Sequence, residues 1–351
     1  MSDPLALARP EIVALTPYAH AAWDPALERL HANESPWRGL ADTSVAGLNR
    51  YPEPQPHELV AALAQLYSVA EENLLVGRGS DEGIDLLTRA FCNAGRDAVL
   101  VCPPTFGMYA VAAQIQGAAV VSVPLRRASG FSLDADAVIA AITPAVKLIY
   151  LCSPNNPTGN ALDPAAMRRV VAAAAGRALV VIDEAYAEFS AAPSFTRELG
   201  TTPHLVVLRT LSKAHGLAGA RVGSLIASAA IVDLLRKIIP PYAIPQPTVE
   251  AAMRALSPPQ LAASAARVTE IRGERERVAR ALAEPSGVQR VWPSDANFLL
   301  VDFDAPDQAF AAMQRAGLLV RDQRRQPGLA NALRITIGTP EQNDRLIRSL
   351  A

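Results

Sequence analysis

Short, continuous runs of Val, Ile and Leu separate helical stretches over the first two thirds of the chain, and this alternation most restricts the possible fold. Typical runs are Ala98–Cys102, Lys147–Leu151 and Ala178–Ile182. They lack the apolar–polar alternation of a strand with one wet face, so we expect strands that are buried on both faces. Such strands alternating with helices predict an α/β fold, in which helices cover a mainly parallel sheet.

The pattern changes near Pro240, where several prolines interrupt the chain. A long charged helix is expected between Leu261 and Ala283. The strands of a second sheet are then expected at Val288–Trp292, Asn297–Asp302 and Leu333–Ile337. We therefore predict an N-terminal arm over residues 1–45 that packs on the small domain or a partner, a large domain over 46–245 and a smaller α+β domain over 246–351.

Charge and composition exclude several classes of protein. The chain has 33 Lys and Arg against 34 Asp and Glu, whereas a nucleic-acid-binding protein needs a basic excess. Its apolar runs are far shorter than the roughly 20 residues of a membrane helix, and Met1–Pro10 lacks the pattern of a secretory signal. The three cysteines form no disulfide or zinc pattern, and the five histidines lack ligand spacing. We expect a soluble, cytoplasmic protein with no metal site.

A glycine-rich segment, Gly77–Gly83, follows a predicted strand and opens a helix predicted over Asp81–Phe91. The first N–H groups of a helix and its dipole attract anions, so Ser80 and Asp81 are candidate phosphate-binding residues. Either residue also suits a simple N-cap. The third glycine comes one position late for the dinucleotide fingerprint. A cap, a phosphate site and a dinucleotide site therefore remain alternatives.

Two polar segments directly follow predicted strands. Ser153–Gly159 (SPNNPTG) is typical of a stiff turn, yet rigid amides at the carboxyl end of a strand also suit hydrogen bonding to a ring substituent. Asp183–Tyr186 (DEAY) combines a carboxylate with a phenol. An aspartate in this position is usually a cap or turn residue, but with the phenol it can contact two sides of a planar ligand. Both interpretations stay open.

The segment Thr210–Arg221 contains Lys213 among small and apolar residues, with hydroxyl groups close by. Most lysines are solvated surface residues. A desolvated lysine, however, has a lowered pKa and forms Schiff bases, and hydroxyls with an arginine bind phosphate. An anion site, an amide, a carboxylate with a phenol and such a lysine, all at strand ends of one sheet, together match what a pyridoxal-phosphate pocket requires.

These residues resemble the aspartate-aminotransferase superfamily of pyridoxal-phosphate enzymes (fold type I), and within it the histidinol-phosphate aminotransferase family. The more specific segments are Asn49–Pro52 (NRYP), Pro103–Tyr109 (PPTFGMY) and Val320–Gln323 (VRDQ). The resemblance implies a homodimer that uses pyridoxal 5′-phosphate to transaminate L-histidinol phosphate with 2-oxoglutarate in histidine biosynthesis. An aromatic amino-acid aminotransferase, a phosphothreonine decarboxylase and a non-catalytic binding protein that keeps the fold stay alternatives.

The resemblance also implies roles for single residues. Lys213 is expected to bind the cofactor covalently and to move the proton between substrate and cofactor, and Asp183 to pair with the pyridine nitrogen. Phe106 is expected to stack on the ring, where close relatives usually have a tyrosine. The other implied cofactor contacts are Tyr186 and Asn156 at the ring oxygen, and Ser80, Asp81, Thr210, Ser212, Arg221 and the partner subunit's Tyr51 at the phosphate. The implied substrate contacts are Tyr18, Asn33, Arg321 and Arg334.

Overall fold

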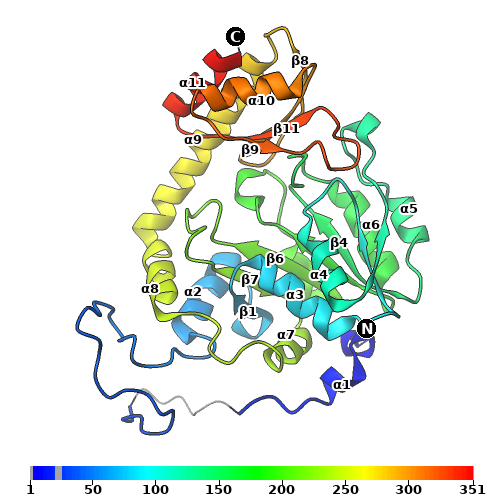
Figure 1. Cartoon of the computed structure of the whole chain (residues 1–351). Helices are drawn as coiled ribbons and strands as arrows, with labels where there is room; N and C mark the ends of the chain where they lie inside the picture. Colours follow the sequence, from blue (N-terminus) through cyan, green and yellow to red (C-terminus); the bar gives the residue numbers. More distant parts are fainter. Residues whose placement is uncertain (1–2, 20–25, 351) are drawn as a thin grey trace.

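Two β-sheets organise the computed structural model, which describes residues 3–19 and 26–350 (Figure 1). The larger sheet has seven strands in the order β1-β7-β6-β5-β4-β2-β3, in which β7 runs antiparallel to both of its neighbours and the other pairs are parallel. Its strands are β1 (Leu74–Gly77), β2 (Ala98–Val101), β3 (Ala119–Ser122), β4 (Val146–Cys152), β5 (Leu179–Asp183), β6 (Leu205–Thr210) and β7 (Gly223–Ile226). The predicted α/β fold with a mainly parallel sheet is confirmed.

The large sheet is buried on both faces, as its continuous apolar runs predict. Val180 and Ile182 of β5 belong to one hydrophobic cluster, and Leu179 and Val181 belong to the cluster on the opposite face. The helices of the first face are α2 (His57–Tyr67), α5 (Ala135–Ala140), α6 (Pro164–Ala174) and α8 (Gln246–Ala255). Those of the second face are α3 (Ser80–Phe91), α4 (Met108–Gln116) and α7 (Ala229–Arg236).

The smaller sheet is antiparallel, in the order β10-β11-β9-β8. Its elements are β8 (Val288–Val291), β9 (Phe298–Phe303), β10 (Arg321–Asp322), β11 (Ala332–Thr336) and the helices α9 (Pro258–Leu282), α10 (Pro306–Arg315) and α11 (Pro340–Leu350). The three helices cover one face of this sheet. From the other face, Leu300 and Ala332 join the hydrophobic cluster of the large sheet. The smaller α+β part predicted for the C-terminal region is therefore present; the predicted domain boundaries stay predictions.

One local prediction was wrong. The helix predicted between Leu261 and Ala283 begins earlier than expected, because Pro258 and Pro259 form the first turn of α9. The first N–H groups of a helix have no partner within it, so proline is tolerated in this turn and its restricted φ angle favours the helix.

The N-terminal region contains a short 3-10 helix, Pro4–Leu7, followed by the short helix α1 (Pro10–Val13). Residues 26–50 form no helix or strand, and Figure 1 shows this segment extending away from the two sheets. Its far end is attached to the body of the molecule, because the Val45 amide donates a 3.0 Å hydrogen bond to Glu250 of α8. Within the described ranges, no helix is both long and apolar enough to span a membrane.

A buried carboxylate connects the two sheets. Asp302 of β9 is 1% exposed and accepts 2.7 Å hydrogen bonds from Arg127, which follows β3 of the large sheet, and from the indole of Trp292. The Arg127 guanidinium also lies 5.1 Å from the centre of the Trp292 ring. This cluster holds the small sheet against the loop that follows β3.

Replacing Asp302 with Ala is expected to lower the free energy of unfolding by roughly 2–4 kcal/mol, because a buried indole N–H and a partly buried guanidinium lose their acceptor. Chemical denaturation measures this change. The matched control is Asp304→Ala, since Asp304 is exposed and its side chain accepts a hydrogen bond from the exposed Gln289; its effect should stay within about 0.5 kcal/mol. Equal effects of the two substitutions would contradict the role given to Asp302.

Candidate active site

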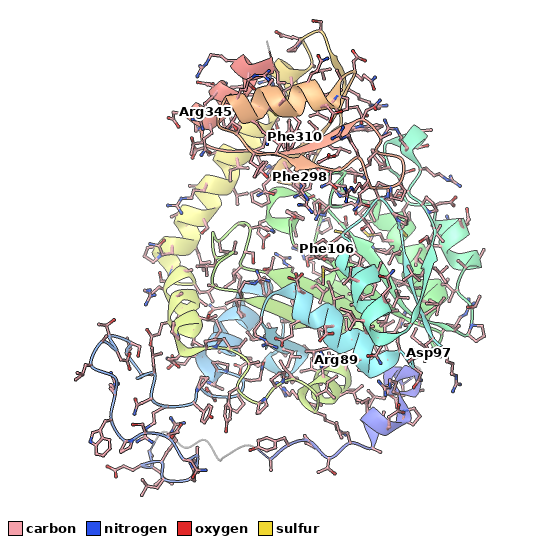
Figure 2. The ribbon with its side chains drawn as sticks, in the orientation of Figure 1. Arg89, Asp97, Phe106, Phe298, Phe310 and Arg345 are labelled. Carbon is pink, nitrogen blue, oxygen red and sulfur yellow. The ribbon has the colours of Figure 1, made fainter. Side chains whose placement is uncertain are left out.

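A cavity of about 490 Å³ lies where the carboxyl edge of the large sheet faces the small sheet. Neighbouring strands β4, β5 and β6 end at this edge, and in Figure 2 Phe106 and Phe298 mark the large-sheet and small-sheet sides of the region. The cavity brings together most of the predicted site residues. They are Ser80, Asp81, Phe106, Asn156, Asp183, Tyr186, Thr210, Ser212, Lys213, Arg221, Arg321 and Arg334.

One end of the cavity is suited to an anion. Helix α3 begins there at Ser80, directed by Gly79 at φ +85°, a conformation that favours glycine. The Arg221 guanidinium lies 3.0 Å from Asp81 and 3.5 Å from the Ser212 hydroxyl, which accepts a 2.9 Å hydrogen bond from Thr210. A helix N-terminus, two hydroxyls and an arginine together form a phosphate-binding arrangement.

The carboxylate of Asp183 lies deep in the cavity at the end of β5 and is 2% exposed. It accepts hydrogen bonds from the hydroxyl of Tyr109, at 2.7 Å, and from the amide of Ala185, at 3.0 Å. Among the described residues, no basic side chain forms an ion pair with it. Burial raises the pKa of Asp183 to about 6, against the lowering effect of these two hydrogen bonds. A buried carboxylate without a cation favours a ligand that brings a positively charged N–H group.

The segment DEAY divides its side chains between the cavity and the protein interior. Asp183 and Tyr186 line the cavity, whereas Glu184 accepts a 2.9 Å hydrogen bond from Arg209 and others from Ser194 and the Phe195 amide. These interior bonds fix the turn after β5. The turn thereby directs the carboxylate of Asp183 and the phenol of Tyr186 toward the same space.

The two asparagines of SPNNPTG are divided in the same way. Asn155 is 1% exposed, and its amide bonds Pro104 at 2.9 Å, Thr105 at 2.9 Å and Thr158 at 2.6 Å. These contacts hold the turn, and the next residue, Asn156, lines the cavity. The turn and ligand interpretations of this motif are thus compatible, because they apply to different asparagines.

Lys213 follows β6, and its ammonium group lies 5.6 Å from the centre of the Tyr186 ring. No carboxylate of the described ranges forms an ion pair with it. Burial lowers the pKa of Lys213, and the guanidinium of Arg334 lowers this pKa further, although Asp81 acts in the opposite direction. A larger fraction of neutral, nucleophilic amine is therefore present at a given pH than for a solvated lysine.

The small sheet contributes two arginines to the cavity. Arg321 of β10 and Arg334 of β11 are direct cross-strand partners, and opposite residues of an antiparallel pair project from the same face. Arg334 hydrogen-bonds the side-chain oxygen of Asn156, while its Nε is buried without a partner. Two adjacent guanidinium groups suit a phosphate or a carboxylate in this part of the cavity.

Three predicted site residues lie outside the cavity of this single chain. Tyr51 is 50% exposed and stacks on Tyr242 with ring centres 4.6 Å apart. Tyr18 is 73% exposed, and Asn33 lies in the N-terminal segment with φ +56°. All three precede α2, and their roles in ligand binding stay predictions.

Sequence reasoning missed several residues of the site. Tyr109 contacts Asp183, and Gln323 lines the cavity with only 7% exposure. Gln326 also lines it and donates a 3.4 Å hydrogen bond to the Thr105 carbonyl. The available signal was the family resemblance, since Tyr109 and Gln323 belong to the segments PPTFGMY and VRDQ and Gln326 lies three residues after VRDQ.

Comparisons with known proteins agree with this geometry. The family model described as "Aminotransferase class I and II" matches residues 32–350. The chain is 55% identical over 323 residues to a histidinol-phosphate aminotransferase of Xylella fastidiosa, covering 92% of this chain and 88% of that one. It is 54% identical to the protein of that name from Xanthomonas campestris pv. campestris, covering 92% and 89%.

Solved structures share the fold. The histidinol-phosphate aminotransferase of Sinorhizobium meliloti, in complex with pyridoxal-5′-phosphate, superposes with a TM-score of 0.75 at 29% identity, covering 87% of this chain and 84% of that one. An aspartate aminotransferase mutant of Thermus thermophilus superposes with a TM-score of 0.73 at 23% identity, covering 86% and 87%. The second likeness shows the aspartate-aminotransferase-like fold alone.

Replacing Arg334 with Gln is expected to raise the pKa of Lys213, because a nearby cation is removed. Since only the neutral amine attacks an aldehyde, the pH profile of imine formation between the cofactor-free protein and pyridoxal should shift to higher pH. Borohydride trapping at several pH values measures this rate. Arg321→Gln is the control. The charge of Arg321 affects the pKa of Arg334, but it is not among the main causes of the lowered pKa of Lys213. An unshifted profile in Arg334→Gln would refute the coupling.

Proposed function

This chain belongs to the class I and II aminotransferases, and we propose that it transfers the amino group of L-histidinol phosphate to 2-oxoglutarate, yielding imidazole-acetol phosphate and glutamate in histidine biosynthesis. The relatives that are 55% and 54% identical to it carry the name histidinol-phosphate aminotransferase. The observation that carries the proposal is the pair of arginines, Arg321 and Arg334, across the cavity from the lysine segment. Histidinol phosphate has a phosphate where ordinary amino-acid substrates have a carboxylate, and two guanidinium groups suit that dianion.

The residues of the cavity fit pyridoxal 5′-phosphate, the cofactor of this family. The cluster around Arg221 and the start of α3 suits its phosphate, and the buried carboxylate of Asp183 suits its protonated ring nitrogen. Tyr186 and Asn156 supply hydrogen-bonding groups for the ring oxygen, and Phe106 an apolar surface for the ring face. When bound, the cofactor supplies an electrophilic carbon and a ring that accepts electrons.

The chain's own groups then have separate roles in the mechanism. Lys213 would hold the cofactor covalently, and its free amine would move the proton between the substrate carbon and the aldehyde carbon of the cofactor. Asp183 keeps a negative charge beside the ring nitrogen. Arg321 and Arg334 hold the substrate phosphate in the first half-reaction and the carboxylates of 2-oxoglutarate in the second. Tyr18 and Asn33 lie outside the cavity of the single chain and would contact the substrate only in the assembled dimer.

We propose that the protein acts as a cytoplasmic homodimer. The segment before α2 exposes several large apolar side chains, and their contact with water is unfavourable. A second copy of the chain would cover them. They are Tyr18, Leu27, Leu30, Trp37, Leu40, Val45, Leu48 and Tyr51. In such a dimer the partner subunit's Tyr51 would reach the cofactor phosphate. The three cysteines are free and buried, which is compatible with a reducing compartment.

The substrate is tested by a single half-reaction. Cofactor-loaded protein is mixed with L-histidinol phosphate and no acceptor, and the absorbance of the aldehyde form of the cofactor is followed as the amine form appears. Fast conversion is expected with L-histidinol phosphate and slow conversion with phenylalanine. Equal or faster conversion with phenylalanine would identify an aromatic amino-acid aminotransferase, and carbon dioxide release from phosphothreonine would identify a decarboxylase.

Lys213→Ala is expected to abolish both turnover and borohydride-stable attachment of the cofactor, because no other group of the site forms the covalent link. Mass spectrometry of the reduced protein measures the attachment. Lys147→Ala is the control, since Lys147 bonds the Pro144 carbonyl outside the cavity, and it should keep full labelling. Full activity of Lys213→Ala would exclude the proposed mechanism.

The dimer is tested by replacing Trp37 and Leu40, which are 79% and 110% exposed in the single chain, with Ser. Burying each such side chain contributes about 1.5–3 kcal/mol, so the dimer dissociation constant should rise by about 100-fold or more. Sedimentation equilibrium measures this constant. Leu319→Ser changes a residue of similar exposure, 82%, outside the segment before α2 and should leave the constant unchanged. A monomeric parent protein would refute the proposal.

A further inference from the structure

A tyrosine that does not line the cavity lies directly behind it. Tyr109, in the first turn of α4, is fully buried and stacks on Tyr150 with ring centres 4.5 Å apart and planes 7° from parallel. The Tyr109 ring also makes a T-shaped contact with the ring of Phe106, and the two ring centres lie 5.6 Å apart. Packing on both rings leaves the phenol little freedom to rotate away.

The Tyr109 hydroxyl has a specific partner in this position. It donates a 2.7 Å hydrogen bond to Oδ2 of Asp183, while the Ala185 amide donates to Oδ1. Each carboxylate oxygen therefore accepts one hydrogen bond from the protein and keeps a lone pair for a ligand. The two donors come from elements on either side of the carboxylate, α4 and the turn after β5.

The chemical type of the donor matters as much as its position. A lysine or arginine at this point would form an ion pair and cancel the charge of the carboxylate. A phenol orients the carboxylate and leaves the negative charge in place for a cationic ligand group. A phenol in this position is thus suited to a carboxylate that must meet a protonated ring nitrogen.

We propose that Tyr109 is a positioning residue of this enzyme: its hydroxyl holds the carboxylate of Asp183 in the single orientation that meets the ring nitrogen of the cofactor, and so controls cofactor affinity and the rate of amino transfer. Tyr109 acts through Asp183 and does not contact the substrate. The inference rests on the assignment of pyridoxal 5′-phosphate to this cavity, but not on the identity of the amino donor.

The test is Tyr109→Phe, which keeps both ring contacts and removes only the hydroxyl. A hydrogen bond to a charged group accounts for about 10- to 100-fold in binding, so the dissociation constant of pyridoxal 5′-phosphate should rise by that factor. Titration of the cofactor-free protein, followed by absorbance without any substrate, measures it. In the loaded enzyme kcat should fall, while KM for L-histidinol phosphate should stay within about twofold, because Tyr109 lies outside the substrate region.

Tyr150→Phe is the matched control. Tyr150 belongs to the same buried stack, but its hydroxyl lies 3.4 Å from the Ile84 carbonyl and 3.5 Å from Thr88, and it forms no hydrogen bond with Asp183. Its cofactor affinity should equal that of the parent protein. Equal losses in the two variants, or an unchanged affinity in Tyr109→Phe, would overturn the proposal.

A double-mutant cycle separates an effect of Tyr109→Phe that acts through Asp183 from a general effect on folding or packing. With Asp183→Asn as the background, the further change Tyr109→Phe should weaken cofactor binding much less than it does in the parent protein, because the charged acceptor is gone. Equal effects in both backgrounds would overturn the role. Since these titrations contain no amino donor, their failure is distinguishable from a failure of the histidinol-phosphate assignment, which only the half-reaction reports.

Discussion

Parallel strands end at the same edge of a sheet, and the site of this protein depends on that constraint. Strands β4, β5 and β6 are neighbours in the large sheet, so the segments that follow them meet although they are far apart in the chain. Because the sheet is buried on both faces, its strands carry mainly apolar side chains, and the polar residues of the site gather at the ends of the strands and just after them. SPNNPTG, DEAY and the Lys213 segment are those residues.

The polarity of the cavity follows from two charged groups that form no ion pair with any residue the structure describes. Asp183 is a buried carboxylate that receives only neutral donors, and Lys213 is a partly buried amine without an ion-pair partner among the described residues. Each charge is unfavourable in the free protein. A bound cofactor that presents a cationic ring nitrogen to one and a carbonyl carbon to the other offsets both costs. The unfavourable electrostatics of the free site thus contribute to selective binding of the cofactor.

The small sheet completes the cavity from the opposite side. The cross-strand register of β10 and β11 sets Arg321 beside Arg334, and Arg334 reaches Asn156 of the large sheet. The Arg127–Asp302–Trp292 cluster holds the two sheets together beside this contact. The substrate end of the site therefore depends on the relative position of the sheets, whereas most residues proposed to contact the cofactor belong to the large sheet or to the segments that follow its strands.

Much of this protein was determined by the sequence itself. Unbroken apolar runs between helical stretches specify strands buried on both faces, and small, hydroxyl and amide residues directly after them mark the edge where ligands bind; both predictions depend only on local patterns. Which asparagine of SPNNPTG faces the cavity was decided by the tertiary structure, as was the contact of Tyr109 with Asp183, 74 positions away, and of Arg334 with Asn156, 178 positions away. Strand order and cross-strand register create these contacts, and both arise from packing between distant segments, which no local pattern encodes.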